Sequence, residues 1–142
     1  MKSPKEIVSQ FYQNGLSSNP ESNPSVVLPQ ILSDNFISYG TTPEKNKTRE
    51  QLIQQILGMK GMIKDFNFEP MEIIEAGNKV IVRSKIVGTP NSPEGHFMGI
   101  PTDGSKTFET IAIDIHTVEN GKIAYVHHIE DWMTAIMQLK NI

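Results

Sequence analysis

The hydrophobic period of this chain changes near residue 65, and that change constrains the fold more than any other feature of the sequence. Upstream, apolar side chains recur three and four positions apart in residues 7–12 and 52–57, which is the spacing of one helix face. Downstream, apolar and polar residues alternate in residues 79–87 and 107–118, which is the spacing of half-buried strands. Helices followed by antiparallel strands predict an α+β fold, with the helices packed on one face of a curved sheet.

Local signals predict where the elements begin and end. Capping boxes at residues 3–6 and 48–51 should start two helices, because each Ser or Thr is followed three residues later by Glu or Gln. Residues 26–32 indicate a short second helix, limited by the proline inside it. A Glu-Asn-Gly turn at 119–121 joins the last two strands, and residues 131–140 can form a closing helix.

The composition excludes several classes of protein. The chain has 142 residues, which suits one domain covering 1–142. It contains no cysteine, so disulfides and thiolate metal sites are excluded. The net charge of −3 and the lack of a basic stripe argue against nucleic-acid binding. No run reaches the roughly 20 apolar residues of a membrane span, and residues 1–11 lack the apolar run of a signal peptide. We therefore expect a soluble, cytoplasmic protein without a membrane partner.

Short motifs spread over nearly the whole chain add a family resemblance. They are Phe11-Tyr12, residues 32–36, residues 65–68, Val82-Arg83, Gly88-Thr89, residues 97–101 with Gly104, residues 113–115, residues 121–123, Asp131 and Gln138-Leu139. Each motif alone is weak. Together, in this order and at these spacings, they make the chain resemble the SnoaL-like polyketide cyclases of the nuclear transport factor 2-like superfamily.

This resemblance implies a cone-shaped α+β barrel, in which a curved antiparallel or mixed sheet carries the N-terminal helices over its concave face. It also implies a deep apolar pocket for a small hydrophobic ligand, chemistry without a cofactor, and a homodimer formed through the outer faces of the sheets. The loop at 96–104 carries three large apolar side chains, Phe97, Met98 and Ile100. By resemblance they pack near the pocket or the dimer seam; alternatively, they close the edge of the core and touch no ligand.

The chemistry-bearing residues gather on the last hairpin, whose register decides which of them meet. A two-residue turn would place Asp114 opposite His127. A three-residue turn would place Asp114 opposite Val126 and diagonal to His128. We prefer the second form, because it gathers the isoleucines of residues 111–115 on one face. The other face then holds Thr110, Ala112, Asp114, His116, Ala124, Val126, His128 and Glu130.

The residues alone do not decide which way this polar face points. An alternating strand normally turns its apolar side chains to the core and its polar side chains to water. The resemblance implies the reverse: the polar face lines the pocket, with His116 and Val126 beside the ligand. The isoleucine face would then be the dimer interface, because it would otherwise be an exposed apolar patch.

The resemblance also names a candidate catalytic pair. In SnoaL-like cyclases, an aspartate on the last strand acts as general acid/base and a histidine on the preceding strand assists it. His128 matches the aspartate position and Asp114 matches the helper histidine, so the two residue types are exchanged. A second family histidine falls at Val126, which cannot titrate. An Asp–His pair still supports proton transfer, because the carboxylate orients the imidazole and raises its pKa.

Other sites known on this fold supply alternatives. A ketosteroid isomerase-like site needs a hydroxyl group, which Tyr12 or Tyr39 could supply, and by resemblance Tyr39 lies near the pocket mouth. A limonene epoxide hydrolase-like site needs an Asp-Arg-Asp set, for which Arg83 and Asp114 are candidates without an evident second aspartate. A metal site is not expected, because the two adjacent histidines of the last strand point to opposite faces.

Three functions therefore remain open from the sequence. The first is a cofactor-independent cyclase or isomerase, which would close a ring by aldol condensation in a small hydrophobic carbonyl compound. In it, His128 would move the proton and Asp114 would orient His128. The second is a non-catalytic pocket that binds a small apolar ligand. The third is a dimerisation module whose pocket is vestigial.

Overall fold

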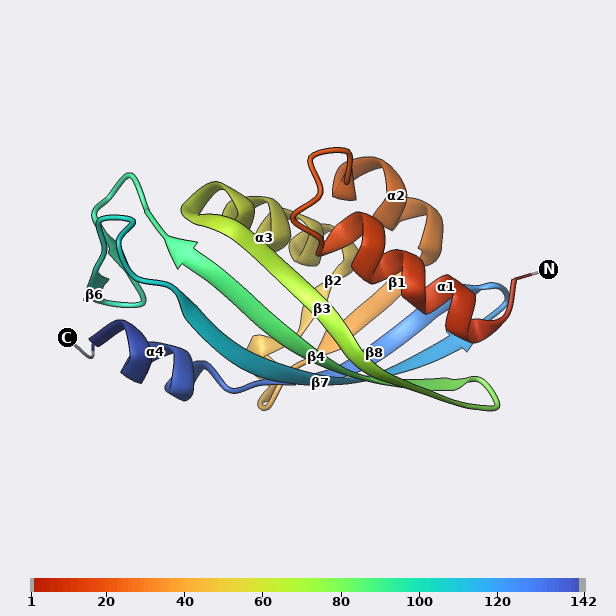
Figure 1. Ribbon diagram of the computed structural model, residues 1–142. Coiled ribbons are helices and arrows are strands. Elements are labelled where there is room, and N and C mark those ends of the chain that lie inside the picture. Colours follow the sequence, from red (N-terminus) through yellow and green to blue (C-terminus); the bar gives the residue numbers. More distant parts are fainter. Residues whose placement is uncertain (1, 141–142) are drawn as a thin grey trace.

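A strongly curved mixed sheet of six strands forms the centre of the computed structural model, which describes residues 2–140 (Figure 1). The strands lie in the order β2-β1-β8-β7-β4-β3, and only the contact between β1 and β8 is parallel. Their bounds are β1 Leu32–Tyr39, β2 Lys47–Thr48, β3 Ile63–Ala76, β4 Lys79–Pro90, β7 Phe108–Glu119 and β8 Lys122–Glu130. A separate ribbon pairs β5, His96–Phe97, with β6, Ile100–Pro101.

Three helices cover the concave face of this sheet, and a fourth lies at its far end (Figure 1). They are α1 Pro4–Gln10, which continues as a π-helical turn through Phe11–Gly15, α2 Pro24–Ile31, α3 Arg49–Met62 and α4 Trp132–Lys140. A short 3-10 turn, Pro43–Lys45, connects β1 to β2. The expected α+β cone, with its N-terminal helices over the concave face, is confirmed.

Both helix starts that the sequence predicts from capping boxes are present in the structure. Ser3 and Glu6 form a reciprocal capping box at α1, and Thr48 and Gln51 form one at α3. The helix α2 is eight residues long and carries Pro29 inside it, as expected for a short helix. Among residues 2–140, no helix combines the length and the apolar character that crossing a bilayer requires.

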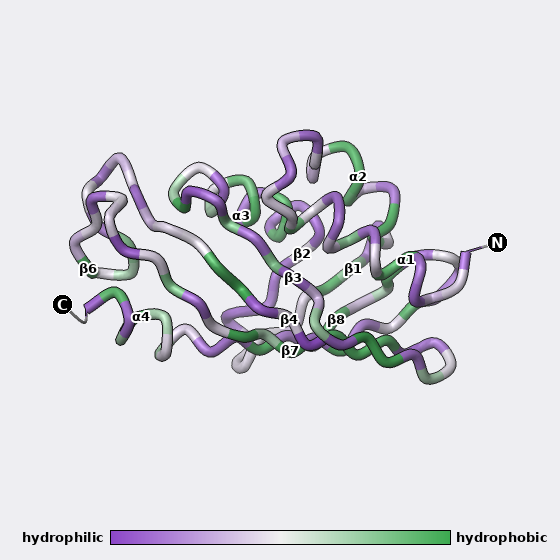
Figure 2. The backbone as a smooth tube through the Cα atoms, viewed as in Figure 1, coloured by the Kyte–Doolittle hydropathy of each residue, from purple (hydrophilic) through white to green (hydrophobic). Residues whose placement is uncertain are grey.

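The two faces of the sheet differ sharply in burial. The polar face of the last hairpin points inward: Asp114 is 2% exposed and His116 is 1% exposed. The isoleucines point outward, from Ile115 at 39% exposed to Ile129 at 58%. Apolar colouring is concentrated along β4, β7 and β8, where they run together beneath the helices (Figure 2). The orientation implied by the family resemblance is therefore confirmed, and the alternative with the isoleucines in the core is wrong.

The register of the last hairpin differs from both forms considered from the sequence. Asn120 and Gly121 form a two-residue turn with φ of 54° and 77°, so the preferred three-residue turn is wrong. A bulge then shifts the register between Thr117 and Val118, because Ala124 is an extra residue on β8. As a result, Asp114 lies directly opposite His128, closer than the expected diagonal.

The loop between β4 and β7 packs two of its three large apolar side chains inward. Phe97 and Ile100 are buried, whereas Met98 is half exposed and adopts a left-handed φ of 52°. The ring of Phe97 lies parallel to that of Phe108 at 6.5 Å. The loop therefore closes one end of the core and places Met98 at its rim.

Candidate functional site

A cavity of about 610 Å³ lies between the helices and the concave face of the sheet. Its walls are mainly aromatic and aliphatic. They include Phe11 and Leu16 after α1, Met59 and Met62 in α3, and Phe66 and Phe68 in β3. A volume of this size and an apolar lining with a few polar groups are typical of a small-molecule site.

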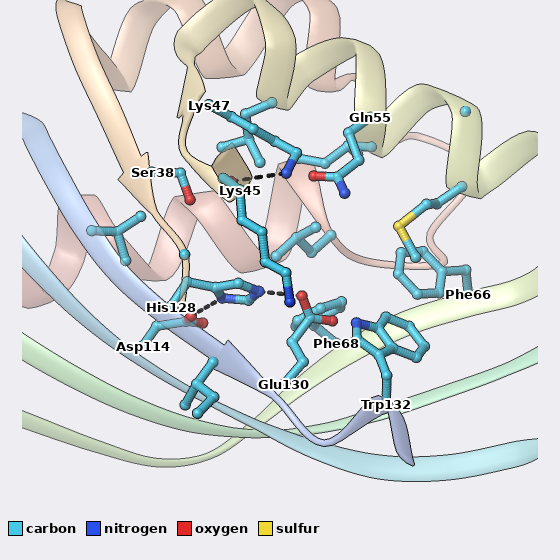
Figure 3. A pocket seen from close by; sticks show the side chains of 18 of the residues that line it. Ser38, Lys45, Lys47, Gln55, Phe66, Phe68, Asp114, His128, Glu130 and Trp132 are labelled. Carbon is cyan, nitrogen blue, oxygen red and sulfur yellow. Dashed lines mark hydrogen bonds and ion pairs between the residues drawn. The ribbon is translucent and has the colours of Figure 1, made fainter. Parts of the chain in front are cut away.

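The polar groups of the cavity converge on His128 (Figure 3). Its Nδ1 atom contacts the Asp114 carboxylate, and its Nε2 atom contacts the Glu130 carboxylate. Asp114 comes from β7 directly opposite, while Glu130 lies two residues further along β8 on the same face. The imidazole is therefore held between two carboxylates, a buried one behind it and one that lines the cavity beside it.

A second layer of hydrogen bonds holds Asp114 from behind. The Tyr12 hydroxyl donates to Asp114 Oδ2 at 2.8 Å, and the same hydroxyl oxygen lies 2.8 Å from His116 Nε2. Since the single hydroxyl proton goes to the carboxylate, His116 must donate its Nε2 proton to Tyr12. Its buried Nδ1 atom has no partner among the described residues, so a second proton there would be unsatisfied. The geometry thus makes His116 a neutral imidazole.

The same surroundings separate the pKa values of the two histidines. Burial lowers the pKa of His116 to about 4. Burial also opposes charge on His128, but the Asp114 and Glu130 carboxylates outweigh burial and raise its pKa to about 10. For Asp114, burial favours the neutral acid, yet the positive charge and hydrogen bond of His128 and the hydrogen bond from Tyr12 leave its pKa below the usual value. At neutral pH, the site therefore holds an imidazolium between two carboxylates.

The structure brings most of the sequence-predicted residues to this cavity. Phe97, Met98, Asp114, His116, Val126 and His128 all line it. Tyr12 does not line it but lies directly behind, as the hydrogen-bond donor to Asp114.

Tyr39 is not at the pocket mouth, and that expectation is wrong. Its neighbour Ser38 takes the inward position on β1, so strand alternation turns Tyr39 outward. There its ring stacks on His127 at 5.0 Å and lies edge-on to Tyr125. Arg83 also lies on the outer face, where it pairs with Glu72, so an Asp-Arg-Asp set is not assembled around Asp114.

Sequence reasoning missed several residues of the site. Glu130 was placed on the correct face but received no role, although its spacing of two from His128 puts both on one side of the strand. Lys45 ends a short turn and Lys47 starts the two-residue strand β2, where no periodic signal exists, so only the folded chain shows that they line the cavity. Trp132, the only tryptophan of the chain, also lines the cavity from the start of α4.

Within residues 2–140, no group of three or more His, Asp or Glu residues has an arrangement suited to holding a metal ion.

Comparison with known proteins agrees with the fold. The sequence model of the SnoaL-like polyketide cyclases matches residues 6–139. The chain belongs to the SnoaL-like polyketide cyclase family. No curated protein matches the chain in sequence.

Solved structures with this family's fold superpose on nearly the whole chain. IdmH from Streptomyces antibioticus, described as a proposed polyketide cyclase, has a TM-score of 0.80 at 20% identity, covering 99% of this chain and 100% of its own. A SnoaL-like protein from Jannaschia sp. CCS1 has a TM-score of 0.79 at 16% identity, covering 100% and 98%. AclR from Streptomyces galilaeus, described as a proposed hydroxylase, has a TM-score of 0.76 at 14% identity, covering 99% of each chain. At these identities the likeness shows the fold, which serves more than one activity.

Proposed function

We propose that this SnoaL-like protein is a cofactor-independent acid/base enzyme that acts on a small hydrophobic carbonyl compound. One observation carries the proposal: a histidine clamped between two carboxylates faces into an apolar cavity of about 610 Å³. Buried titratable groups with strongly displaced pKa values, gathered in a cleft, are typical of catalytic sites. The reaction class that fits best is enolisation followed by an intramolecular aldol step.

In this proposal, His128 acts as the acid and Glu130 acts as the base. His128 is already protonated at neutral pH, so it starts as the acid, and the Glu130 carboxylate is the available base. Glu130 turns from His128 to the substrate and takes the proton from the carbon next to the carbonyl, and the His128 Nε2–H that it releases donates to the enolate oxygen. The new carbon–carbon bond leaves an alkoxide, which takes that proton. Glu130 then returns its proton to His128 across their existing contact.

Asp114 has a positioning role in the same scheme. It contacts His128 on the side away from Glu130 and is itself held by Tyr12. Its negative charge keeps His128 protonated, and its contact at Nδ1 turns Nε2 toward Glu130, which lines the cavity. The exchange of residue types relative to the family pattern therefore keeps a proton-transferring residue on β8 and a supporting partner on β7, with their charges reversed.

Hydrogen exchange into simple ketones tests the proposal without knowledge of the natural substrate. Apolar ketones such as 4-phenylbutan-2-one are incubated with the protein in D₂O, and loss of their α-proton NMR signals is followed over time. We expect exchange faster than in buffer, and a loss of about a hundredfold or more in His128→Gln and Glu130→Gln, the usual size of a general acid/base contribution.

The adjacent residue supplies a matched control. His127 lies on the same strand but faces outward, so His127→Gln should exchange protons at the wild-type rate. Binding is followed separately through Trp132 fluorescence, since this side chain lines the cavity. Ketones that bind but exchange no faster than in buffer would overturn the catalytic proposal and favour a non-catalytic ligand-binding pocket.

We also propose that a second copy of the chain covers the outer face of the sheet. Ile111, Ile113, Ile115 and Ile129 are each 39% exposed or more and lie side by side on β7 and β8. The rim of this patch carries paired charges of both signs, including Arg83 with Glu72 and Lys85 with Glu69. An apolar centre with a charge-balanced rim is compatible with itself, as a two-fold interface requires.

A further inference from the structure

Two lysines line the cavity, Lys45 from the short turn between β1 and β2 and Lys47 from the start of β2 (Figure 3). Lys45 extends into the cavity toward Glu130, and Lys47 lies above it near Gln55. The Lys47 ammonium donates to the Lys45 carbonyl oxygen at 3.1 Å. Neither ammonium forms an ion pair with a carboxylate of residues 2–140. Two cations without an ion-pair partner among these residues therefore face a cavity whose walls are mainly apolar.

Two hydrogen bonds hold the turn that carries Lys45 in place. Asn46 Oδ1 accepts the Gly40 backbone N–H at 3.0 Å, and the Lys45 backbone N–H donates to the Thr42 carbonyl at 2.9 Å. A Cβ atom at Gly40 would lie 2.6 Å from the Cβ atom of Lys45, so only glycine lets the lysine backbone approach so closely. The start of the Lys45 side chain is thus held in place by the fold.

The charged groups that line the cavity do not balance, and one additional negative charge would neutralise them. Asp114 and Glu130 are negative, whereas Lys45, Lys47 and the protonated His128 are positive. These five groups have a net charge of +1, in a chain whose overall net charge is −3. Lys45 is exposed and Lys47 is half-buried, so water screens part of their charge, but an uncompensated positive charge still attracts an anionic ligand group.

The polar and apolar parts of the cavity also occupy different ends. Ser38, Gln55 and the Lys47 ammonium lie on one side and Phe66 and Trp132 on the other, while the Lys45 ammonium lies between them beside Glu130 (Figure 3). A ligand with an anionic group at one end and an apolar body at the other matches this division, with its middle portion beside His128 and Glu130.

We propose that the cavity selects small organic acids, whose carboxylate is bound by Lys45 and Lys47 while the apolar body packs against Phe66 and Trp132. This inference rests on the proposed function, because it takes the same cavity as the substrate site. It adds a substrate class: keto acids with an apolar body, in which the reacting carbonyl lies between the carboxylate and the apolar end.

A matched pair of ligands tests this selection by binding alone. The probes are 4-phenylbutanoate and 4-phenylbutan-1-ol, which share an apolar body and differ in the charged group. Titration followed by Trp132 fluorescence and by calorimetry should show the acid binding at least about tenfold more tightly than the alcohol, the usual gain from a charge-assisted contact. That preference should shrink as salt is added.

Lysine variants test whether Lys45 and Lys47 cause the preference for the acid over the alcohol. Lys45→Met and Lys47→Met should each lower acid affinity by about tenfold or less and leave alcohol affinity within about twofold, which also shows that the cavity is intact. Lys64→Met is the control, because Lys64 is exposed on β3 and does not line the cavity. It should bind both probes as the wild-type protein does.

The possible outcomes separate this inference from the proposed function. Equal binding of acid and alcohol, no acid binding at about 1 mM, or an acid preference that survives loss of both lysines would each overturn the selection of acids. None of these results depends on turnover. Conversely, acid preference with no ketone exchange would leave the binding site standing and overturn only the catalysis.

Discussion

Replacing Asp114 by asparagine tests the charge state on which the candidate site depends. Asparagine keeps the shape of the side chain, and its oxygen can still accept the Tyr12 hydroxyl, but the negative charge beside His128 is removed. In the wild-type protein, burial opposes protonation of His128, and the two carboxylates outweigh burial to raise its pKa to about 10. The variant loses the larger of these two favourable contributions.

The size and sign of the effect follow from proton linkage. The folded pKa of His128 lies above its ordinary value of 6.5, so protonation stabilises the folded state. The stabilisation is complete below pH 6.5 and is lost as the pH rises to about 10. At about 1.36 kcal/mol for each unit of pKa, the interval of 3.5 units corresponds to about 5 kcal/mol. We expect Asp114→Asn to remove about 3 kcal/mol of this near pH 7 and almost nothing near pH 10.

The free energy of unfolding, measured in urea through Trp132 fluorescence at pH values from 5 to 10, checks this expectation. The curves for wild-type protein and variant should lie apart at neutral pH and converge toward pH 10. Both free energies of unfolding should fall as the pH drops from 6.5 toward 4. In this range His116 binds a proton in the unfolded chain, whereas buried His116 in the folded protein stays neutral until about pH 4. A gap that is constant across the alkaline range would refute the assignment of a charged His128.

Two further predictions concern the sheet. Changing Ile113 and Ile115 to arginine should separate the proposed dimer into monomers in sedimentation, while ligand binding in the cavity is retained, because both side chains face outward. Gly88→Ala should lower the free energy of unfolding by about 2 kcal/mol, since a Cβ atom there would lie 2.3 Å from Ile63 Cγ2. Gly61→Ala should instead raise it by about 0.5 to 1 kcal/mol, because this position in α3 has open space around it.

The elements of this fold could be predicted because their signals are local. Capping at Ser3 and at Thr48 involves atoms within one helical turn, so the sequence alone identifies it. The shared face of Asp114 and His116 on β7, and that of His128 and Glu130 on β8, follow in the same way from strand alternation, since the members of each pair are two positions apart. That the two pairs lie on one face depends on the hairpin register. That the polar face points inward needed the family resemblance, because strand alternation defines two faces and does not say which one is buried.

The register of the hairpin was decided by tertiary structure. The sequence Asn120-Gly121 is compatible with a two-residue turn, but the bulge at Ala124 is what brings Asp114 opposite His128. A bulge depends on how a strand bends to fit its neighbours, here β1 and β7 on either side of β8, so no short motif predicts it. The expected three-residue turn is wrong, yet it places the polar residues on the correct face. The observed turn and bulge together shift the pairing by two residues from that expectation, and a shift of two residues leaves each side chain on the same face.

Sequence thus determined which residues form helices and strands, and which side chains share a face, because both depend on neighbours within a few positions. Only the folded chain decided what those faces meet. It turned Tyr39 outward, brought Lys45 and Lys47 from a turn and a two-residue strand to the cavity, and placed Glu130 against His128. The charge on His128 was also decided by the tertiary structure. It arises because two carboxylates outweigh the effect of burial, and these three conditions exist together only after folding.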